Sequence, residues 1–223
     1  MPLPPPFLFD LDGTLAMTIT DLAASVNHVR ALRGLPQLTE THVQAFVGDG
    51  ARTLLRRALA EVLPADAAAA EPAIDAAFAE YVAHHEHQCT VHVRPFDGVR
   101  EHLELLHERG HRCAVVTNKP ERFAKKIVDK LDLGELLTVV VGGDTLPLRK
   151  PDPAPLLHAL QQLGAGVAGA TMVGDGVQDL RAAKAAGVRT IGCLFGYGDR
   201  VALIREGADA WWSAFGRPGD PRI

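Results

Sequence analysis

The sequence of 223 residues lacks the features that mark several special classes of protein. No stretch reaches the roughly 18 apolar residues that a membrane span needs, and the first residues do not resemble a secretory signal. Cysteine is scarce: Cys89, Cys113 and Cys193 are odd in number and widely spaced, which argues against a disulfide or metal framework. These absences predict a cytoplasmic protein that has no membrane partner.

An excess of basic charge is also missing. The chain has 23 Lys and Arg against 27 Asp and Glu, so its formal net charge is −4, and we expect no nucleic-acid partner. No lysine precedes Lys119. What is present, 47% hydrophobic and 22% charged residues, is ordinary for a globular protein. The length suits one domain with an insert.

From Val99 onward, short apolar runs alternate with segments of helical periodicity. This alternation predicts an α/β fold with a mainly parallel sheet. The apolar runs that we interpret as strands are 113–117, 139–141, 171–173 and 190–194.

The first third of the chain behaves differently, because the pattern stays helical after a first strand at 7–9. We expect one helix capped by Thr20, a second over 50–63, and a third with Pro72 in its first turn. Residues 17–93 are therefore predicted to form an all-helical insert. Residues 1–16 and 94–223 would form the α/β core.

Two carboxylates, Asp10 and Asp12, follow the first predicted strand and are separated by one residue. Residues at this spacing point to the same side of an extended segment. Like charges that lie this close are unfavourable unless a cation neutralises them, and this end of a parallel strand is where α/β sheets bind ligands.

Three further segments carry polar residues at the same rim of the predicted sheet. Thr117 and Asn118 end one strand, Lys150 lies in a loop that prolines stiffen, and Asp175 and Asp179 end another strand and begin a helix. Carboxylate oxygens suit Mg²⁺, and a lysine with hydroxyl and amide donors suits a phosphoryl group. The combination indicates phosphoryl transfer.

These four segments resemble, in order, the four motifs of the haloacid dehalogenase superfamily, and within it the bacterial phosphoglycolate phosphatases. The resemblance extends over nearly the whole chain, and local matches lie at 47–50, 116–120, 142–144 and 182–187. It implies a Rossmann-like core, a mobile helical cap formed by the insert, and Mg²⁺ as cofactor.

The resemblance also implies roles for the first-motif residues. Asp10 attacks phosphorus and becomes a phosphoaspartate, while Asp12 protonates the leaving group and then activates water. Mg²⁺ would be held by the Asp10 carboxylate, the Asp12 backbone carbonyl and Asp175.

The remaining motif residues are implied to hold the phosphate. Thr117, the N–H of Asn118 and Lys150 bind its oxygens, and Asp179 orients Lys150 or a metal-bound water. Asp12 favours phosphate esters over haloacids, since a halide leaving group needs no proton. The absence of lysine from residues 1–118 removes the phosphonate-cleaving reaction, which uses a cap lysine.

In the insert, Gly48, Asp49 and Gly50 form a glycine-rich turn that leads into a predicted helix. A helix N-terminus offers free N–H groups to an anion, and Arg52 would add a fork for a carboxylate. Alternatively, the glycines only permit a tight turn and Arg52 is solvated. The insert has five arginines and nine acidic residues and thus carries the whole net charge of −4, so recognition of an anion there must be local.

Three positions depart from the phosphoglycolate phosphatase pattern and bear on the substrate. Met17 and Thr18 replace an acidic residue and a serine, Asp49 replaces asparagine, and Gly176 replaces serine or threonine. We expect a phosphomonoesterase for 2-phosphoglycolate or a similarly small phosphorylated acid, as a monomer or homodimer. The alternatives are a sister phosphatase for a sugar phosphate or pyrophosphate, and a phosphate-sensing or partner-binding protein without turnover.

Overall fold

The computed structural model describes residues 4–216, and its main sheet has six strands in the order β5-β4-β1-β6-β7-β8. Every neighbouring pair in it is parallel, which confirms the predicted fold class. The strands are β1 (Phe7–Phe9), β4 (Cys113–Val116), β5 (Val139–Val141), β6 (Thr171–Gly174), β7 (Arg189–Cys193) and β8 (Ala210–Trp212).

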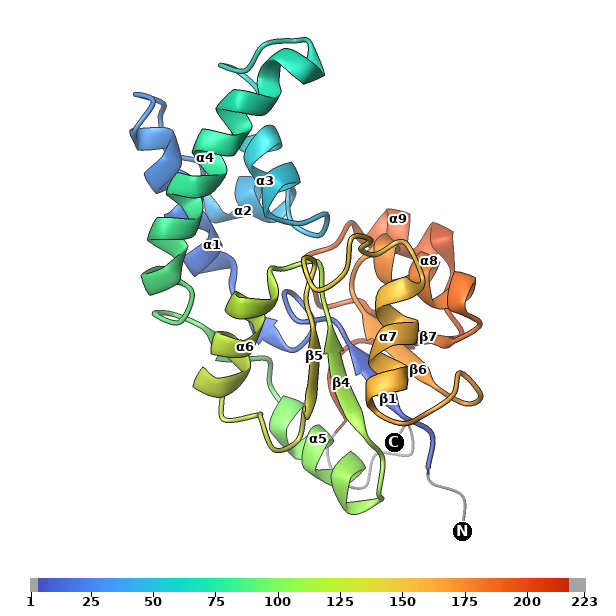
Figure 1. Cartoon of the computed structure of the whole chain (residues 1–223). Helices are drawn as coiled ribbons and strands as arrows, with labels where there is room; N and C mark the ends of the chain where they lie inside the picture. The colour runs from blue at the N-terminus through green and yellow to red at the C-terminus, as the bar shows by residue number, and fades with distance from the viewer. Residues whose placement is uncertain (1–3, 217–223) are drawn as a thin grey trace.

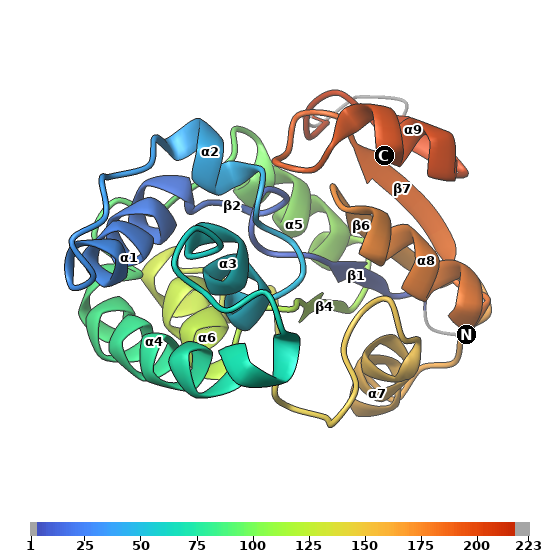
Figure 2. The ribbon, with the colours of Figure 1, turned by 90° about the horizontal axis from the view of Figure 1, so that it is seen from above.

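Helices cover both faces of this sheet (Figure 2). Phe9 of β1 packs into a cluster with α5 (Val99–Glu108) and α6 (Glu121–Lys130) on one face. The next residue back, Leu8, packs on the other face with α7 (Ala154–Gln162) and α8 (Val177–Ala186), while α9 (Arg200–Glu206) lies beside α8. Because successive side chains of a strand point to opposite faces, the apolar run of β1 supplies both cores.

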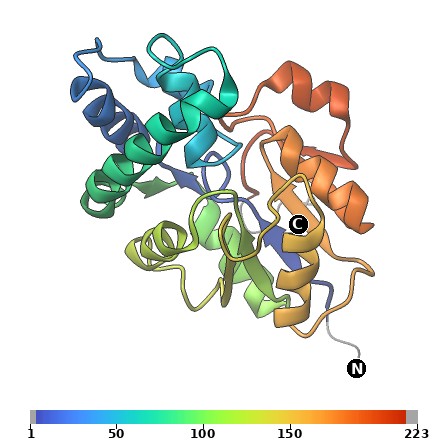
Figure 3. The same cartoon turned by 45° about the horizontal axis from the view of Figure 1, so that its top comes forward.

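Four helices form a separate body above the sheet (Figures 1 and 3). They are α1 (Ile19–Ala31), α2 (Glu40–Gln44), α3 (Ala51–Ala58) and α4 (Ala67–Gln88). The chain enters this cap through β2 (Ala16–Met17) and leaves it through β3 (Arg94–Pro95), and these two short strands pair antiparallel. The cap has an apolar cluster of its own, which Phe123 of α6 joins from the core. Within residues 4–216, no helix is long and apolar enough to cross a membrane.

The starts of two cap helices differ from the prediction. Helix α1 begins at Ile19, with Thr18 rather than Thr20 at the N-cap, and α4 begins at Ala67, so Pro72 lies inside it and not in its first turn. The Asp66 side chain caps α4 by accepting a hydrogen bond from the N–H of Ala69 at 2.8 Å. This cap and the favourable alanine run offset the backbone hydrogen bond that Pro72 cannot donate.

Candidate active site

The polar residues of the four motifs meet at the carboxyl ends of three adjacent strands. Asp10 follows β1, Thr117 follows β4 and Asp175 follows β6, and β1 lies between the other two strands. After β5 the chain crosses to the opposite side of β1 to form β6. Open α/β sheets bind ligands at such a reversal of strand order, so this topology places the motif residues where a site is expected.

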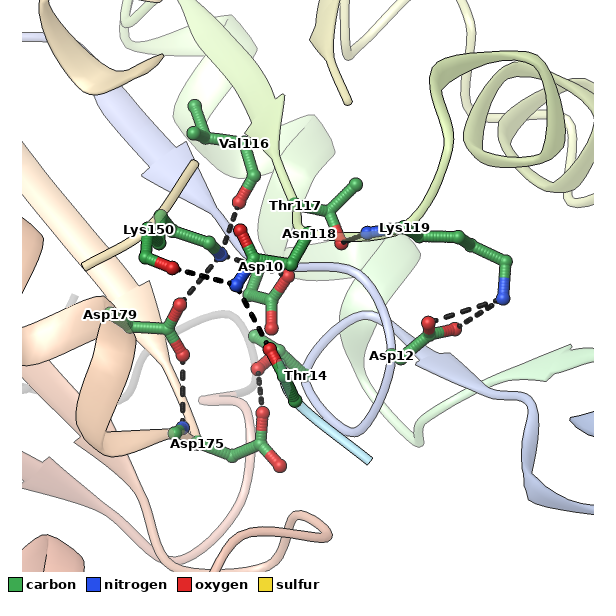
Figure 4. Close-up of polar contacts among 12 residues, drawn as sticks. Asp10, Asp12, Thr14, Val116, Thr117, Asn118, Lys119, Lys150, Asp175 and Asp179 are labelled. Carbon is green, nitrogen blue, oxygen red and sulfur yellow. Dashed lines mark hydrogen bonds and ion pairs between the residues drawn. The ribbon is translucent and has the colours of Figure 1, made fainter. Parts of the chain in front are cut away.

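Lys150 is buried next to Asp10 and links three of these segments (Figure 4). Its Nζ lies 3.1 Å from Asp10 Oδ1 and 2.6 Å from Asp179 Oδ1, and it donates to the Val116 carbonyl at 2.5 Å. Burial alone would lower the pKa of Lys150, but the two aspartates outweigh it, so the pKa lies above its usual value. The ammonium therefore has three acceptors for its three protons. A contact between Lys150 and a phosphate oxygen, as predicted, requires one of these contacts to give way.

Asp175 is held by three donors. Its Oδ1 accepts from the Thr14 hydroxyl at 2.9 Å, and its Oδ2 accepts from the backbone N–H groups of Tyr197 and Gly198 at 2.6 and 3.0 Å. Gly13 adopts a φ of +82°, and a Cβ there would lie only 2.4 Å from Asp175 Oδ2. Only glycine lets the motif turn this closely over the carboxylate.

The charge of the site fits a divalent cation. Oxygens of Asp10, Asp175 and Asp179 all lie within 4.8 Å of one another, and all three residues are buried. Burial raises the pKa values of Asp175 and Asp179, and the charge of Asp10 raises them further. Lys150 supplies one positive charge against three carboxylates. Because oxygen ligands suit Mg²⁺, an ion between Asp10 and Asp175 would neutralise the excess.

Asp179 contacts Lys150 from the first turn of α8. Its Oδ1 contacts the Lys150 ammonium, and its Oδ2 accepts from the N–H of Gly176 at 2.9 Å. Both oxygens are thus engaged within the protein. This geometry fits a residue that orients Lys150.

A cavity of about 490 Å³ lies between these residues and the cap. Asp10, Asp12 and Thr117 line it from the core, and the loop 47–50 lines it from the cap. Asn118 donates to the Gly48 carbonyl at 3.0 Å, so the cap loop touches the core. The predicted glycine-rich turn therefore does border the site.

The structure does not place Arg52 along this cavity, which is where the predicted contact with a substrate carboxylate would need it. Arg52 donates instead to Glu71 and Asp75 on α4, at 3.1 and 2.6 Å. Arg57, five residues further along α3, lines the cavity, and its Nη2 lies 2.5 Å from Asp49 Oδ2. The negative charge that Asp49 brings to the turn is thus paired.

Two residues of the site were missed by sequence reasoning. Lys119 Nζ lies 3.1 Å from both carboxylate oxygens of Asp12. Figure 4 shows Lys119 and Lys150 on opposite sides of the site. The place of Lys119 directly after the Thr117-Asn118 motif is a signal that could have identified it. The Tyr197 hydroxyl accepts from the N–H groups of Thr18 and Ile19 at 2.7 and 3.1 Å, and no motif announces it.

The Gly176 departure has a structural counterpart in Gln178. A Cβ on Gly176 would lie 2.1 Å from Gln178 Nε2. The Gln178 side chain therefore fills the room that a serine or threonine at position 176 would use, and it lines the cavity. An amide group thus occupies the place where the family pattern would have a hydroxyl.

Comparisons with known proteins agree with this geometry. The family model described as haloacid dehalogenase-like hydrolase matches residues 7–193. The phosphoglycolate phosphatase of Pseudomonas syringae pv. tomato is 40% identical over 207 residues, which cover 92% of this chain and 74% of that protein. The phosphoglycolate phosphatase of Neisseria meningitidis serogroup A is 38% identical and covers 90% and 84%. A crystal structure from Haemophilus somnus, described as a predicted phosphoglycolate phosphatase, has a TM-score of 0.83 and 30% identity over 96% of both chains.

Proposed function

Because this chain belongs to the haloacid dehalogenase-like hydrolase family, we propose that it is a Mg²⁺-dependent phosphomonoesterase that hydrolyses 2-phosphoglycolate or a similarly small phosphorylated acid. The observation that carries the proposal is the buried Asp10 carboxylate, which forms an ion pair with the Lys150 ammonium and lines the cavity. Relatives about 40% identical over most of the chain have the name phosphoglycolate phosphatase, which supports the substrate class. The substrate enters as the free small molecule. We retain a cytoplasmic monomer or homodimer as part of the proposal.

In the first step, an oxygen of Asp10 attacks phosphorus and the bond between phosphorus and the ester oxygen breaks. Asp12, at the same rim, gives its proton to that oxygen, so the leaving group departs as the alcohol of glycolate. The phosphoryl group remains on Asp10 as an acyl phosphate. Thr117 and the N–H of Asn118 bind its oxygens, because these donors lie at the end of the neighbouring strand β4.

In the second step, Asp12 takes a proton from a water molecule while the water oxygen attacks phosphorus. The bond between phosphorus and Asp10 breaks, which releases inorganic phosphate and regenerates the Asp10 carboxylate. One water is consumed in each cycle. Asp10, Asp175 and the Asp12 backbone carbonyl would hold Mg²⁺, which when bound supplies the positive charge that lets a carboxylate approach a phosphate anion.

The test is a phosphate-release assay with Mg²⁺ and a panel of 2-phosphoglycolate, small sugar phosphates and pyrophosphate. We expect the highest kcat/KM for 2-phosphoglycolate, and Asp10→Asn should lower kcat by at least about 10³-fold because the nucleophile is lost. Release that is equal in Asp10→Asn would refute the proposed mechanism. A higher kcat/KM for a sugar phosphate or for pyrophosphate would identify the protein as a sister phosphatase for that substrate. No release from any ester would support a phosphate-sensing role without turnover.

A further inference from the structure

The cap offers no unpaired cation to an anionic substrate. It contains five arginines and no lysine, and every one of the five forms an ion pair with an acidic residue of the cap itself. Arg57 is the only one of them that lines the cavity, and it is paired with Asp49. An unpaired positive side chain that could face a negative leaving group must therefore come from the core.

In the described part of the chain, Lys119 is the one core cation that lines the cavity. Its side chain is only 3% exposed, and Asp12 is the only acidic group of residues 4–216 within ion-pairing distance of it. Towards the cap it faces neutral groups: burial and the Lys119 charge lower the pKa of His85 to about 2, and burial raises that of Cys89. A buried ammonium with one carboxylate partner can still donate a hydrogen bond to a second carboxylate.

The contact with Asp12 also has a cost for catalysis. The ammonium lies 3.1 Å from both Oδ1 and Oδ2, so both oxygens that could carry a proton to the ester are engaged. Asp12 must hold a proton on one oxygen and present it to the leaving group. The Lys119 contact has to loosen on one side before the first step can occur.

We propose that Lys119 recognises the negative charge of the leaving group, and that the substrate carboxylate takes the ammonium from Asp12 and so releases an Asp12 oxygen for proton transfer. The inference rests on the proposed phosphatase function and adds how the acid is selected. In 2-phosphoglycolate a single methylene separates the ester oxygen from the carboxylate. When Asp12 faces the ester oxygen, its own partner Lys119 is within reach of that carboxylate. A neutral leaving group leaves the Lys119–Asp12 pair intact and is turned over poorly.

The test compares 2-phosphoglycolate with ethyl phosphate, in which a methyl group replaces the carboxylate. Lys119→Met should lower kcat/KM for 2-phosphoglycolate by about 100-fold, because a buried charge-assisted contact is lost. It should leave kcat/KM for ethyl phosphate equal or raise it, because this ester has no carboxylate to lose and Asp12 is no longer held by Lys119. Lys119→Arg keeps the charge and should restore part of the preference. Lys126→Met is the matched control, since Lys126 pairs with Glu86 outside the cavity and should leave both substrates unaffected.

A binding experiment separates this inference from the proposed function. In the Asp10→Asn background with Mg²⁺, calorimetry should find that Lys119→Met weakens 2-phosphoglycolate binding by about tenfold or more and leaves ethyl phosphate binding unchanged. Asp12→Asn should tighten 2-phosphoglycolate binding only where Lys119 is present, because the ammonium then need not give up a contact with the Asp12 carboxylate in order to bind the substrate.

Equal losses for both esters, in turnover or in binding, would overturn the role of Lys119 while the phosphatase function stands. Absence of phosphate release from every ester by the wild-type protein would instead overturn the proposed function, even if the binding contrast held. Circular dichroism of each variant checks that it folds. If Lys119→Met does not fold, Lys119→Arg decides: an unchanged ratio of the two kcat/KM values, or a greater loss with ethyl phosphate, would overturn the inference.

Discussion

The core and the cap place their charges in opposite ways. The core buries Asp10, Asp175, Asp179 and Lys150 together at one end of its sheet. The cap instead pairs its arginines with its own acids, and most of these pairs are partly exposed. Buried charges shift pKa values and bind ions, whereas exposed pairs contribute little. The buried charges that could hold an ion and a phosphate therefore lie in the core, while the cap bounds the cavity and pairs Asp49, its acidic residue along the cavity, with Arg57.

Removal of one core carboxylate should give the largest effect. Asp175→Asn keeps the shape, since its carbonyl oxygen can accept from Tyr197 and Gly198 while its amide donates to Thr14. We expect at least about a 10³-fold loss of kcat with Mg²⁺, because a metal ligand is lost. The melting temperature without metal should stay equal or rise, because burial and the nearby Asp10 charge disfavour the ionised Asp175.

Thermal unfolding with and without Mg²⁺ checks this prediction. The ion should raise the melting temperature of the wild-type protein, since a ligand that binds only the folded state stabilises it. It should leave that of Asp175→Asn almost unchanged. An equal increase in both proteins would mean that Asp175 does not hold the metal.

The contrast between the two regions also explains how far the sequence could predict the site. The core residues Asp10, Thr117 and Asp175 each directly follow a strand with a strong apolar pattern, so their meeting at one rim follows from parallel topology. Arg52 lies on a cap helix, where the pattern gives no indication of which face meets the core. Ion pairs with Glu71 and Asp75 on α4 orient the Arg52 side chain, and these contacts cannot be predicted from the periodicity of α3.

The contacts at Thr18 and Ile19, the junction between β2 and α1 that we call the hinge, could not be predicted from the sequence either. Thr18 makes no side-chain cap to α1, and the acceptor for the first N–H groups of the helix comes from Tyr197, far along the chain. The same residue donates its own N–H to Asp175. Contacts between residues so distant in sequence leave no local periodicity or spacing to detect. The position of Pro72 inside α4 has a local cause, because the Asp66 side chain caps the helix and so starts it before Pro72.

A change at this hinge should have an intermediate effect and would sharpen the boundary between the regions. Tyr197→Phe removes the hydroxyl acceptor for Thr18 and Ile19 and keeps the backbone contact with Asp175. Loss of a helix cap costs about 1 kcal/mol. We expect faster amide exchange at the start of α1, unchanged exchange in β1 and β6, and a loss of kcat/KM of about three- to tenfold. Equal acceleration in those core strands would mean that Tyr197 supports the core rather than the hinge.

The smallest effect should come from the cap arginine that the sequence favoured. Arg52→Gln breaks partly exposed pairs with Glu71 and Asp75, and such pairs contribute at most about 1 kcal/mol. Because Arg52 does not line the cavity, KM for 2-phosphoglycolate and for ethyl phosphate should both change by less than about twofold. Steady-state kinetics with the two esters decide the matter. A rise in KM confined to 2-phosphoglycolate would place a substrate-binding charge in the cap, and the division of labour between the two regions would then be wrong.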